Sequence, residues 1–530
     1  YTTAPVTITF SSTCISQGLA SVAASGSTSA GSTANTVETT TGTADATYTA
    51  KGCSGSDVIT ASATIGSTNL TATGTVTVAS AATGSLEFVS AMPGIIGLKG
   101  TGQPSTSTVI FKVLDSTGAP KAGVTVTFSL NTTVGGLSFS PVSATSAADG
   151  TVQTVVSSGT VHTPVTVTAT IASPALSTQS SSLTVSTGIP ASNTFTVAVG
   201  PAVYPGQTTT PPACPNVEAW DLEGVNVPIT VSLADRYNNP VLDGTAVSFY
   251  TDGGKITGSC TTANGTGTCQ GTNDTVDWTS ENPQPTPDTA LPSKSSEPGR
   301  VVLLATAIGE ESFDDANGSG FYQSGDTFTN LGDPYDNSQE LSAPQLYSNS
   351  AYVLGDYFLD YKQTGQYAPP PTPPVFVGIT CNGTTASSTC TENALAISQS
   401  ALIIMSTGGA QVVATGATGA FALNGSGQIV TGTGSSGTIT FTISSYYGDY
   451  SPPTAANPIS AGSTVAVTAT GVGTLSATSG SFTEGCSTNP AGDQYTIYLT
   501  SVPSPPSGYV TFQVTSAGTK TLTTVDIPVN

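Results

Sequence analysis

The stretch that decides the fold is Asp115-Ser-Thr-Gly-Ala-Pro-Lys-Ala-Gly123, which leads directly into Val124-Thr-Val-Thr-Phe128. An Asp that opens a turn bonds nearby backbone, Gly118 can adopt a positive φ, and Pro120 fixes the exit from the turn. The alternation of Val and Phe with Thr has the two-residue period of a strand with one buried face. The stretch therefore predicts a tight turn that enters a half-buried β-strand.

The same combination recurs at Asp235-Arg-Tyr-Asn-Asn-Pro240, which leads into Thr245-Ala-Val-Ser-Phe249. The two opening Asp residues lie 120 residues apart, and a Gly pair follows each copy. The copies close with Val165-Thr-Val-Thr-Ala-Thr170 and Val301-Val-Leu-Leu-Ala-Thr306, and a weaker copy lies at residues 460–470. A turn and two strands that repeat at this interval predict tandem domains of one architecture.

The two-residue period runs through the whole chain. Clusters of Gly, Pro, Asn and Asp separate the alternating segments, which is typical of β-sandwiches, and no stretch has the period of an amphipathic helix. With 530 residues and about 150 residues per domain, the chain is expected to be all-β and to hold three or four domains. The predicted strands include residues 6–10, 109–113, 124–128, 165–170, 247–250 and 465–470.

These residues resemble the bacterial immunoglobulin-like (Ig-like) domain of the invasin and intimin type. Its pattern is Asp-x-x-Gly-Asn-Pro-Val-x-Gly, then Val-Thr-Phe, Gly-Gly, Asp-Gly and finally Val-Thr-Ala-Thr. The second segment matches nearly throughout, with Asp149-Gly150 at the inner turn, whereas the last segment is degenerate. The resemblance implies four tandem Ig-like β-sandwiches in an extracellular surface protein, with a load-bearing or adhesive role.

Four domains are expected on this basis. They are an incomplete Ig-like domain at 1–83, an invasin-type domain at 84–187, a domain at 188–406 with an acidic insertion at about 273–374, and a degenerate domain at 407–530.

The first domain is predicted to lack its opening strands. Val6-Thr-Ile-Thr-Phe10 aligns with the middle strand at 124–129, and residues 57–63 align with the closing strand, so the first one or two strands have no counterpart. Such a sandwich exposes open sheet edges. Two explanations stay open: the chain is part of a longer tandem array, or a neighbouring subunit donates the strand in a head-to-tail polymer.

The composition excludes several classes of function. Only 8% of residues are charged, and 32 acidic against 10 basic residues give a net charge of −22, which leaves no basic face for nucleic acid. The sequence contains no run of about 20 apolar residues, so no transmembrane segment is predicted. The single histidine, His162, removes the usual general base and zinc ligand, so we expect no enzyme.

The even number of cysteines predicts disulfides and an oxidising compartment, and hence an exported protein found outside the cell or on its surface. Proximity in the sequence pairs Cys14 with Cys53, Cys260 with Cys269, and Cys381 with Cys390. The remaining two, Cys214 and Cys486, either pair with each other or one of them crosses to another subunit.

The acidity is concentrated in residues 214–362, which hold 21 of the 32 acidic residues. Within this region, residues 315–326 follow the spacing of a 12-residue calcium loop, with Gly320 at the sharp turn. We therefore expect one structural calcium ion, although Ser at position 5 and Asp at position 12 weaken the pattern. The expected ligands are Asp315, Asn317, Ser319, the carbonyl of Phe321, Gln323 and Asp326.

Two functions are consistent with these features. The first is an extracellular structural protein, a rod or fibre subunit that associates with itself and is stabilised by disulfides and calcium. The alternative is a cell-surface adhesin that binds a host or glycan ligand through the insertion or the terminal domain.

Overall fold

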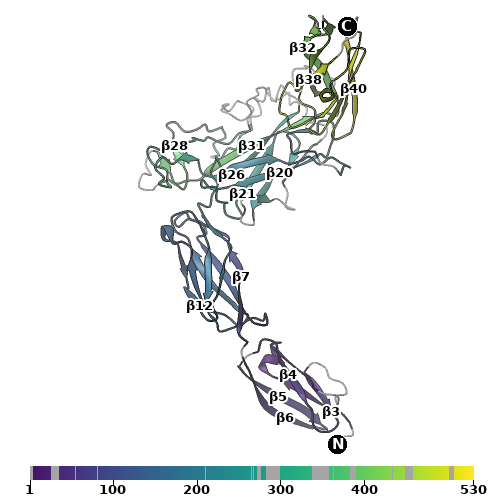
Figure 1. Cartoon of the computed structure of the whole chain (residues 1–530). Helices are drawn as coiled ribbons and strands as arrows, with labels where there is room; N and C mark the ends of the chain where they lie inside the picture. Colours follow the sequence, from purple (N-terminus) through teal and green to yellow (C-terminus); the bar gives the residue numbers. More distant parts are fainter. Residues whose placement is uncertain are drawn as a thin grey trace. The chain divides into compact units, whose positions relative to one another are not determined.

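The structure is a computed structural model in which strands dominate (Figure 1). It forms two compact units, residues 1–185 and 186–530, which are described one at a time. The single α-helix among the described residues, α1 (Thr13–Ser16), has four residues, so none of these residues forms a helix able to cross a membrane. The described residues are 4–25, 35–53, 55–79, 81–208, 211–263, 266, 268–270, 276–281, 299–336, 357–361, 363–381, 389–432, 434–447, 457–500 and 507–530.

The second sandwich has the strand order of an Ig domain. One sheet has the order β11-β13-β9-β7 and the other β12-β10-β15-β16, which correspond to the two facing sheets of the Ig fold. Phe111 and Phe128 pack between the sheets with ring centroids 5.9 Å apart. The strands are β7 (Thr83–Met92), β8 (Ile95–Gly97), β9 (Thr106–Asp115), β10 (Thr125–Leu130), β11 (Ser138–Ser140), β12 (Ser143–Thr145), β13 (Thr151–Ser157), β14 (Thr163–Val165), β15 (Val167–Ile171), β16 (Leu176–Gln179) and β17 (Leu183–Ser186).

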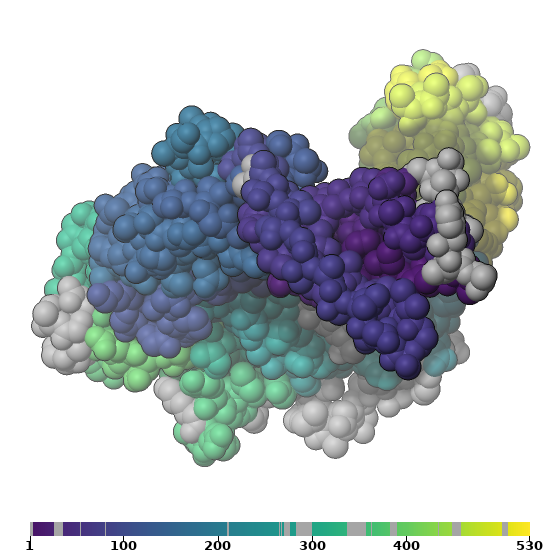
Figure 2. Space-filling view, turned by 90° about the horizontal axis from the view of Figure 1, so that it is seen from below, coloured from purple at the N-terminus to yellow at the C-terminus, as the bar shows by residue number. Residues whose placement is uncertain are grey.

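The first sandwich, shown in purple in Figure 2, has unequal layers. One sheet has four strands in the order β3-β1-β5-β6, whereas the other described sheet holds only β2 and β4. The absence of the opening strands from this domain stays a prediction. The strands are β1 (Val6–Ser11), β2 (Ala20–Ala24), β3 (Thr36–Thr39), β4 (Ala46–Ala50), β5 (Gly55–Ile65) and β6 (Thr68–Val78).

The third sandwich begins the second unit. A four-stranded sheet, β18-β20-β25-β22, faces a six-stranded sheet, β19-β31-β26-β21-β23-β24, around a core that includes Trp278. The strands are β18 (Phe195–Val199), β19 (Asn216–Glu218), β20 (Asn226–Leu233), β21 (Ala246–Thr251), β22 (Lys255–Ile256), β23 (Ser259–Thr262), β24 (Cys269–Gln270), β25 (Val276–Thr279), β26 (Arg300–Gly309) and β31 (Leu395–Ser406).

The bounds predicted for the insertion were too early. β25 and β26 lie within the predicted range of about 273–374, but both belong to the sheets of the sandwich. Their sequences explain this, because Val276 and Trp278 are buried and β26 is an almost fully buried apolar strand. The insertion instead follows β26 and ends before β31. Its described strands are β27 (Phe313–Asp314), β28 (Thr327–Phe328), β29 (Phe376–Val377) and β30 (Cys390–Thr391).

The fourth sandwich closes the second unit. Its sheets have the orders β32-β35-β38 and β33-β34-β40-β39-β36-β37, and Phe441 and Phe512 meet between them. The domain boundaries predicted from the sequence remain predictions. The strands are β32 (Ala410–Gly419), β33 (Phe421–Leu423), β34 (Ile429–Thr431), β35 (Gly437–Ser445), β36 (Thr464–Thr470), β37 (Ser481–Thr483), β38 (Asp493–Leu499), β39 (Gly508–Thr515) and β40 (Leu522–Val529).

The repeated Asp-to-Pro turn forms as predicted. Asp115 accepts hydrogen bonds from the N–H groups of Thr117 and Ala119 at 2.8 and 3.0 Å, and Asp235 accepts from the equivalent groups of the second copy at 2.9 Å. Gly118 and Asn238 both adopt a positive φ, at 84° and 60°. Each turn therefore presents its following strand to the sandwich in the same way.

Candidate functional site

The loop predicted to bind calcium, residues 315–326, joins β27 to β28 in the insertion. The Asp315 carboxylate accepts hydrogen bonds from the N–H groups of Ser319 and Gly320 at 3.0 and 2.7 Å. The side-chain oxygen of Asn317 accepts from the same Ser319 N–H at 3.0 Å. Gly320 has a φ of 82°, which a residue with a side chain rarely adopts. The loop is therefore closed at the sharp turn that the sequence indicated.

Asp326 closes the other end of this loop. Its carboxylate accepts from the N–H groups of Ala316 and Gln323, both at 3.0 Å, and the Ser319 hydroxyl donates to the carbonyl of Phe321 at 2.9 Å. Asp315, Asn317, Ser319 and Asp326 thus each place a side-chain oxygen in contact with the N–H or C=O groups of the loop itself.

A cation from the third sandwich lies beside the loop. The Arg236 guanidinium is 3.8 Å from the Asp315 carboxylate and donates to the Gly320 carbonyl at 2.9 Å, as does the Tyr237 hydroxyl. Burial raises the pKa of Asp315, but the amide hydrogen bonds and Arg236 outweigh it and lower the pKa overall. The loop is consequently held as an anion against the sandwich.

The donor set suits calcium in kind, because it consists of oxygens alone. Among the described residues, however, the only three acidic, histidine or cysteine ligand atoms within 4.8 Å of one another are those of Cys14, Cys53 and Asp57, and these two cysteines form a disulfide. Calcium therefore stays a prediction, and Asp315 and Asp326 are the residues that would bind it.

A second loop repeats this geometry. Asp360 accepts hydrogen bonds from the N–H groups of Thr364 and Gly365 at 2.9 and 2.6 Å, and the Thr364 hydroxyl donates to the Gln366 carbonyl at 2.7 Å. These are the same contacts that Asp315 and Ser319 make. The common signal was an Asp followed four and five residues later by a hydroxyl residue and Gly.

Other acidic residues of the insertion bind backbone amides. The Glu311 carboxylate accepts from the N–H groups of Leu331 and Val377 at 2.7 and 2.8 Å, and burial raises the pKa of Glu311 to about 7. Asp333 and Asp336 likewise accept from amides about 20 to 35 residues away along the chain. These carboxylates therefore fasten separate segments of the insertion to one another.

Glu310 fastens the insertion at its root, where it leaves β26. One carboxylate oxygen accepts from the N–H and hydroxyl of Thr380 at 3.2 and 2.8 Å, and the other has no hydrogen-bond partner among the described residues. The side chain is fully buried, and this burial raises its pKa to about 7, although the Thr380 hydrogen bonds oppose the shift.

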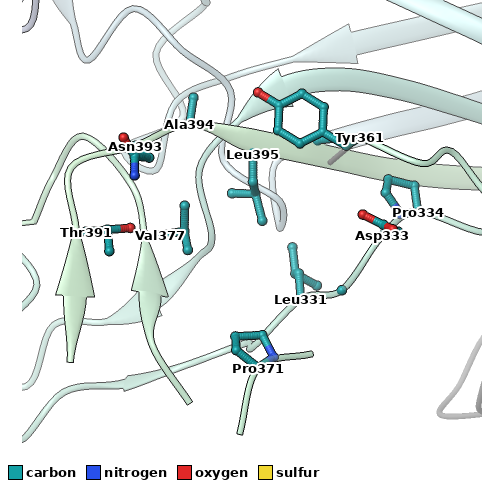
Figure 3. Close-up of a pocket in the computed structure, with 12 residues that line it drawn as sticks. Leu331, Asp333, Pro334, Tyr361, Pro371, Val377, Thr391, Asn393, Ala394 and Leu395 are labelled. Carbon is teal, nitrogen blue, oxygen red and sulfur yellow. The ribbon is translucent and has the colours of Figure 1, made fainter. Parts of the chain in front are cut away.

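Two cavities flank the segment Leu331–Pro334 of the insertion. One of about 570 Å³, shown in Figure 3, is lined by residues that include Tyr361, Asn393 and Leu395. The other, of about 830 Å³, is lined by residues that include Tyr335. Aromatic and amide side chains beside such cavities are able to contact a small polar ligand.

The junction between the third and fourth sandwiches is covalent. Cys214, just before β19, forms a disulfide with Cys486 in the fourth sandwich, 272 residues further along the chain. The buried Asn216 side chain donates to the carbonyls of Ile459 and Gly485 at 2.8 and 3.0 Å. Strand β19 therefore joins the sheet of the third sandwich while its side chains bind the fourth.

Glu218 is the most deeply engaged acidic residue of this junction. Its carboxylate, which has no exposed surface, accepts from the Thr519 N–H at 2.9 Å and the Ser516 hydroxyl at 3.2 Å. It also accepts from the Thr519 hydroxyl and from the N–H of Gly518. One carboxyl group thus accepts from four donors in the loop between β39 and β40.

A buried cation completes the junction. Arg300, at the start of β26, donates to the side chain of Asn457 at 2.9 Å and to the carbonyl of Thr488 at 2.7 Å. Asn457 donates in turn to the Tyr447 hydroxyl at 2.9 Å. The sequence analysis did not predict a role for Glu218 or Arg300, because their hydrogen-bond partners lie more than 150 residues away along the chain.

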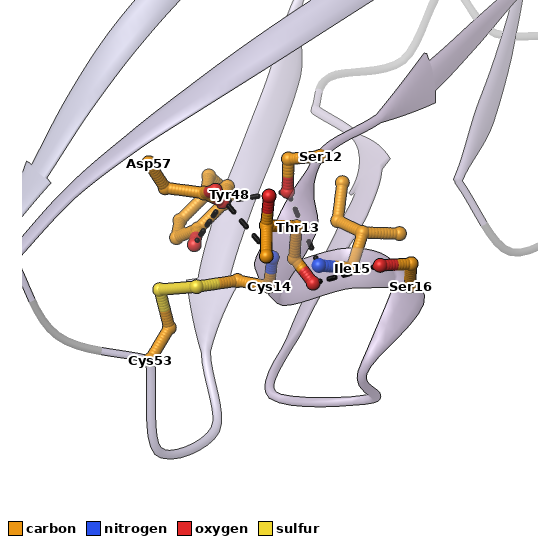
Figure 4. Close-up of a disulfide and its surroundings, with 8 residues drawn as sticks. All are labelled: Ser12, Thr13, Cys14, Ile15, Ser16, Tyr48, Cys53 and Asp57. Carbon is orange, nitrogen blue, oxygen red and sulfur yellow. Dashed lines mark hydrogen bonds between the residues drawn. A yellow bond between two sulfur atoms is a disulfide. The ribbon is translucent and has the colours of Figure 1, made fainter.

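The first sandwich has its own covalent fastening. Figure 4 shows the disulfide between Cys14 and Cys53 beside Asp57, whose carboxylate accepts from the Ser12 hydroxyl at 2.6 Å and the Tyr48 hydroxyl at 2.9 Å. The Ser12 hydrogen bond is the main cause of a lowered pKa for Asp57. This cluster ties α1 and β4 to the start of β5.

All eight cysteines are paired. The three pairs expected from proximity are present, and Cys214 pairs with Cys486, so the alternative in which one of them crosses to another subunit does not apply here.

The strand order and the disulfides together define a protein of tandem, covalently pinned Ig-like β-sandwiches. This is the fold that the resemblance to invasin and intimin domains predicted.

Comparison with solved structures finds bacterial surface proteins at low sequence identity. The D0-D1 domain of intimin is 16% identical, with 42% of this chain and 90% of that chain covered and a TM-score of 0.19. InvD of Yersinia pseudotuberculosis and the Escherichia coli adhesin FdeC are each 14% identical over 84% of this chain and 96% of theirs, with TM-scores of 0.22 and 0.23. The fold class rests on the strand order of the sheets. No protein-family model and no curated protein matches the chain.

Proposed function

We propose that this chain is an extracellular structural protein, a rod or fibre subunit that assembles head-to-tail when a strand from another copy completes its first sandwich. The observation that carries the proposal is the junction of the third and fourth sandwiches. A linker between independently moving domains is exposed and polar, with few contacts across it. Here a disulfide, the buried Glu218 and the buried Arg300 replace such a linker.

This junction suits a protein that transmits load. Pulling the two sandwiches apart has to expose Glu218 and Arg300 together with the donors and acceptors they satisfy, while the disulfide limits the separation. Buried charged groups that lose their partners cost several kcal/mol. The disulfides also fit an oxidising, extracellular environment.

Electron microscopy of the full chain at increasing concentration tests this function. We expect regular filaments or linear oligomers that lengthen with concentration. A chain that stays monomeric under all conditions would contradict the assembly.

The second candidate function is adhesion, and the cavities beside Leu331–Pro334 favour it. They bring tyrosine, asparagine and proline side chains together on the insertion, which suits a glycan ligand. A glycan array probed with the chain separates the two functions. Specific binding by monomers supports the adhesin, and filaments without glycan binding support the structural protein.

A further inference from the structure

We infer that three contiguous cavities between the insertion and the third sandwich form one elongated groove that binds a linear, uncharged oligosaccharide. The inference rests on the second candidate function, adhesion, which it deepens by assigning the site and the class of ligand. The groove lies entirely within the second unit.

The cavities follow one another because they share lining residues. Asn193 and Ser312 border both a cavity of about 150 Å³ and the cavity of about 830 Å³. The latter shares the segment Leu331–Pro334 and Ala396 with the cavity of about 570 Å³ in Figure 3. Sites for small molecules occupy about 300–1,000 Å³, so this row has room for several linked sugar units.

One wall of the groove is held in place by the proline-rich segment that precedes β29. The Asp333 carboxylate accepts from the Ala368 N–H at 3.0 Å, and the Asp333 N–H donates to the Ala368 carbonyl at 2.8 Å. The Asn330 side chain donates to the Pro371 carbonyl at 3.0 Å. A Cβ on Gly332 would lie 2.6 Å from the Ala368 carbonyl oxygen, so the two segments approach as closely as they do because residue 332 is glycine. A wall fixed in this way does not have to be ordered when a ligand binds.

This wall carries a buried acceptor. The Asn330 NH2 group is bound to Pro371, but the Oδ1 atom of Asn330 is buried and has no hydrogen-bond partner in the described part of the chain. Asn330 lines the cavity of about 830 Å³. Because buried polar atoms are nearly always hydrogen-bonded, this oxygen marks a position at which a ligand hydroxyl is able to donate.

Three further amides lie along the groove. Asn193 lines the cavities of about 150 and 830 Å³, Gln399 lines the latter, and Asn393 lines the cavity of about 570 Å³. Asn193 and Asn393 are exposed, Gln399 is half-buried, and none of the three side chains is hydrogen-bonded to another described residue. An amide both donates and accepts, as a sugar hydroxyl does. The amides therefore suit a ligand that has hydroxyl groups along its whole length.

Tyrosine rings also line the groove. Tyr335 and Tyr367 border the cavity of about 830 Å³, and their ring centroids lie 5.7 Å apart in an edge-to-face arrangement. Tyr361, which is 41% exposed, borders the cavity in Figure 3. The C–H face of a sugar ring packs on an aromatic ring, while the hydroxyls at its rim remain free to bond to amides. Tyrosines and amides together thus favour a saccharide.

The charge of the lining favours an uncharged ligand. None of the described residues that border the three cavities is a lysine, an arginine or a histidine, whereas Asp314 and Asp333 are among them. Carboxylate and phosphate groups of ligands are typically bound by basic side chains. An acidic saccharide would find no such partner in this lining.

The test is binding of the full chain to an array of linear oligosaccharides of about one to six sugar units, both uncharged and acidic. The groove variant combines Asn393→Ala with Gln399→Ala. The control is Gln513→Ala, because Gln513 is an exposed amide on β39 that does not line the groove. The melting temperature of each chain shows whether the substitutions leave the fold intact.

We expect the wild-type and Gln513→Ala chains to bind uncharged oligosaccharides with an affinity that rises with the number of sugar units. The groove variant should bind them about tenfold or more weakly at an unchanged melting temperature. Full binding by the groove variant, or a preference for acidic oligosaccharides, would overturn the inference and leave the adhesin function standing. Absence of binding to every oligosaccharide would reject the groove and the glycan-binding adhesin together.

Discussion

Glu218 shows how one residue can hold two sandwiches together. It belongs to β19, which pairs with β31 of the third sandwich, yet its carboxylate is enclosed by the loop at 516–519 of the fourth. A buried carboxylate is tolerated only when donors surround it. The four donors satisfy this condition. These donors are themselves satisfied only while the Glu218 carboxylate accepts their hydrogen bonds.

Replacing Glu218 by Ala is expected to lower the free energy of unfolding of the second unit by about 3 kcal/mol or more, because each buried donor left unsatisfied costs about 1–3 kcal/mol. Urea unfolding followed by tryptophan fluorescence measures this, since both tryptophans lie in that unit. Glu218→Gln is the matched control, because it keeps the shape and one acceptor and should cost less. A loss below 1 kcal/mol for Glu218→Ala would contradict the described network.

Glu310 predicts a pH dependence. Its pKa is raised from 4.5 to about 7 by burial, so the folded chain binds this proton more tightly than the unfolded chain does. The stabilisation is complete below about pH 4.5 and is lost as the pH rises through about 7. The contribution is about 3 kcal/mol, at about 1.4 kcal/mol per pKa unit. Urea unfolding at intervals from pH 5 to 8 should show the decline.

The variant Glu310→Gln isolates this effect. An amide does not titrate, so the decline of stability between pH 5 and 8 should be smaller in the variant than in the wild-type chain. Equal slopes in the two proteins would show that Glu310 is not buried in its acidic form.

The loop at residues 315–326 is the element in which calcium binding can be tested. If calcium binds, saturation at 100 times the dissociation constant stabilises the folded chain by about 2.7 kcal/mol. The melting temperature should then rise with calcium and fall back with EDTA, and Asp315→Asn should remove the shift. Asp149→Asn, in a turn of the second sandwich, is the control and should keep it. The absence of any shift in the wild-type chain would end the calcium prediction.

The disulfides differ in the length of chain that they close. By loop entropy, the Cys260–Cys269 bridge, with a separation of nine residues, is worth about 3 kcal/mol, and Cys214–Cys486, with 272, about 5–6 kcal/mol. Cys214→Ser with Cys486→Ser should therefore lower the melting temperature of the second unit more than Cys260→Ser with Cys269→Ser does. Calorimetry of both double variants measures this, and the reverse order would contradict it.

Elements with local signals were predictable from the sequence. The Asp-to-Pro turns, the alternating strands and the short-range cysteine pairs each depend on residues that lie close together in the chain. The bounds of the insertion were not predictable in the same way, because 20 residues separate β25 from β26 and only the burial of these strands assigns them to the sandwich.

The candidate sites were also predictable only where their residues lie close together in the chain. The closed Asp315 loop was foreseen because its residues are contiguous, whereas Arg236 beside it comes from the repeated turn of the third sandwich. The roles of Glu218 and Arg300 could not be predicted, since each residue bonds to groups far away along the chain and such contacts leave no pattern in a single sequence.

For the whole molecule, the distribution of the few charged residues has a structural explanation. Most of the acidic residues lie between 214 and 362, where many of them bind backbone amides and fasten the insertion. The remaining chain presents mainly Thr, Ser, Gly and Ala. Such a surface suits close association of like chains, because little charge has to be brought together.

The central claim is that copies of this chain assemble through an added strand. A cryo-electron microscopy map of the assembled material tests it most directly, at a resolution that separates strands about 4.8 Å apart. The account predicts that each first sandwich contains one additional strand contributed by a neighbouring copy. Filaments in which no strand from another copy enters the first sandwich, or preparations that contain only monomers, would contradict it.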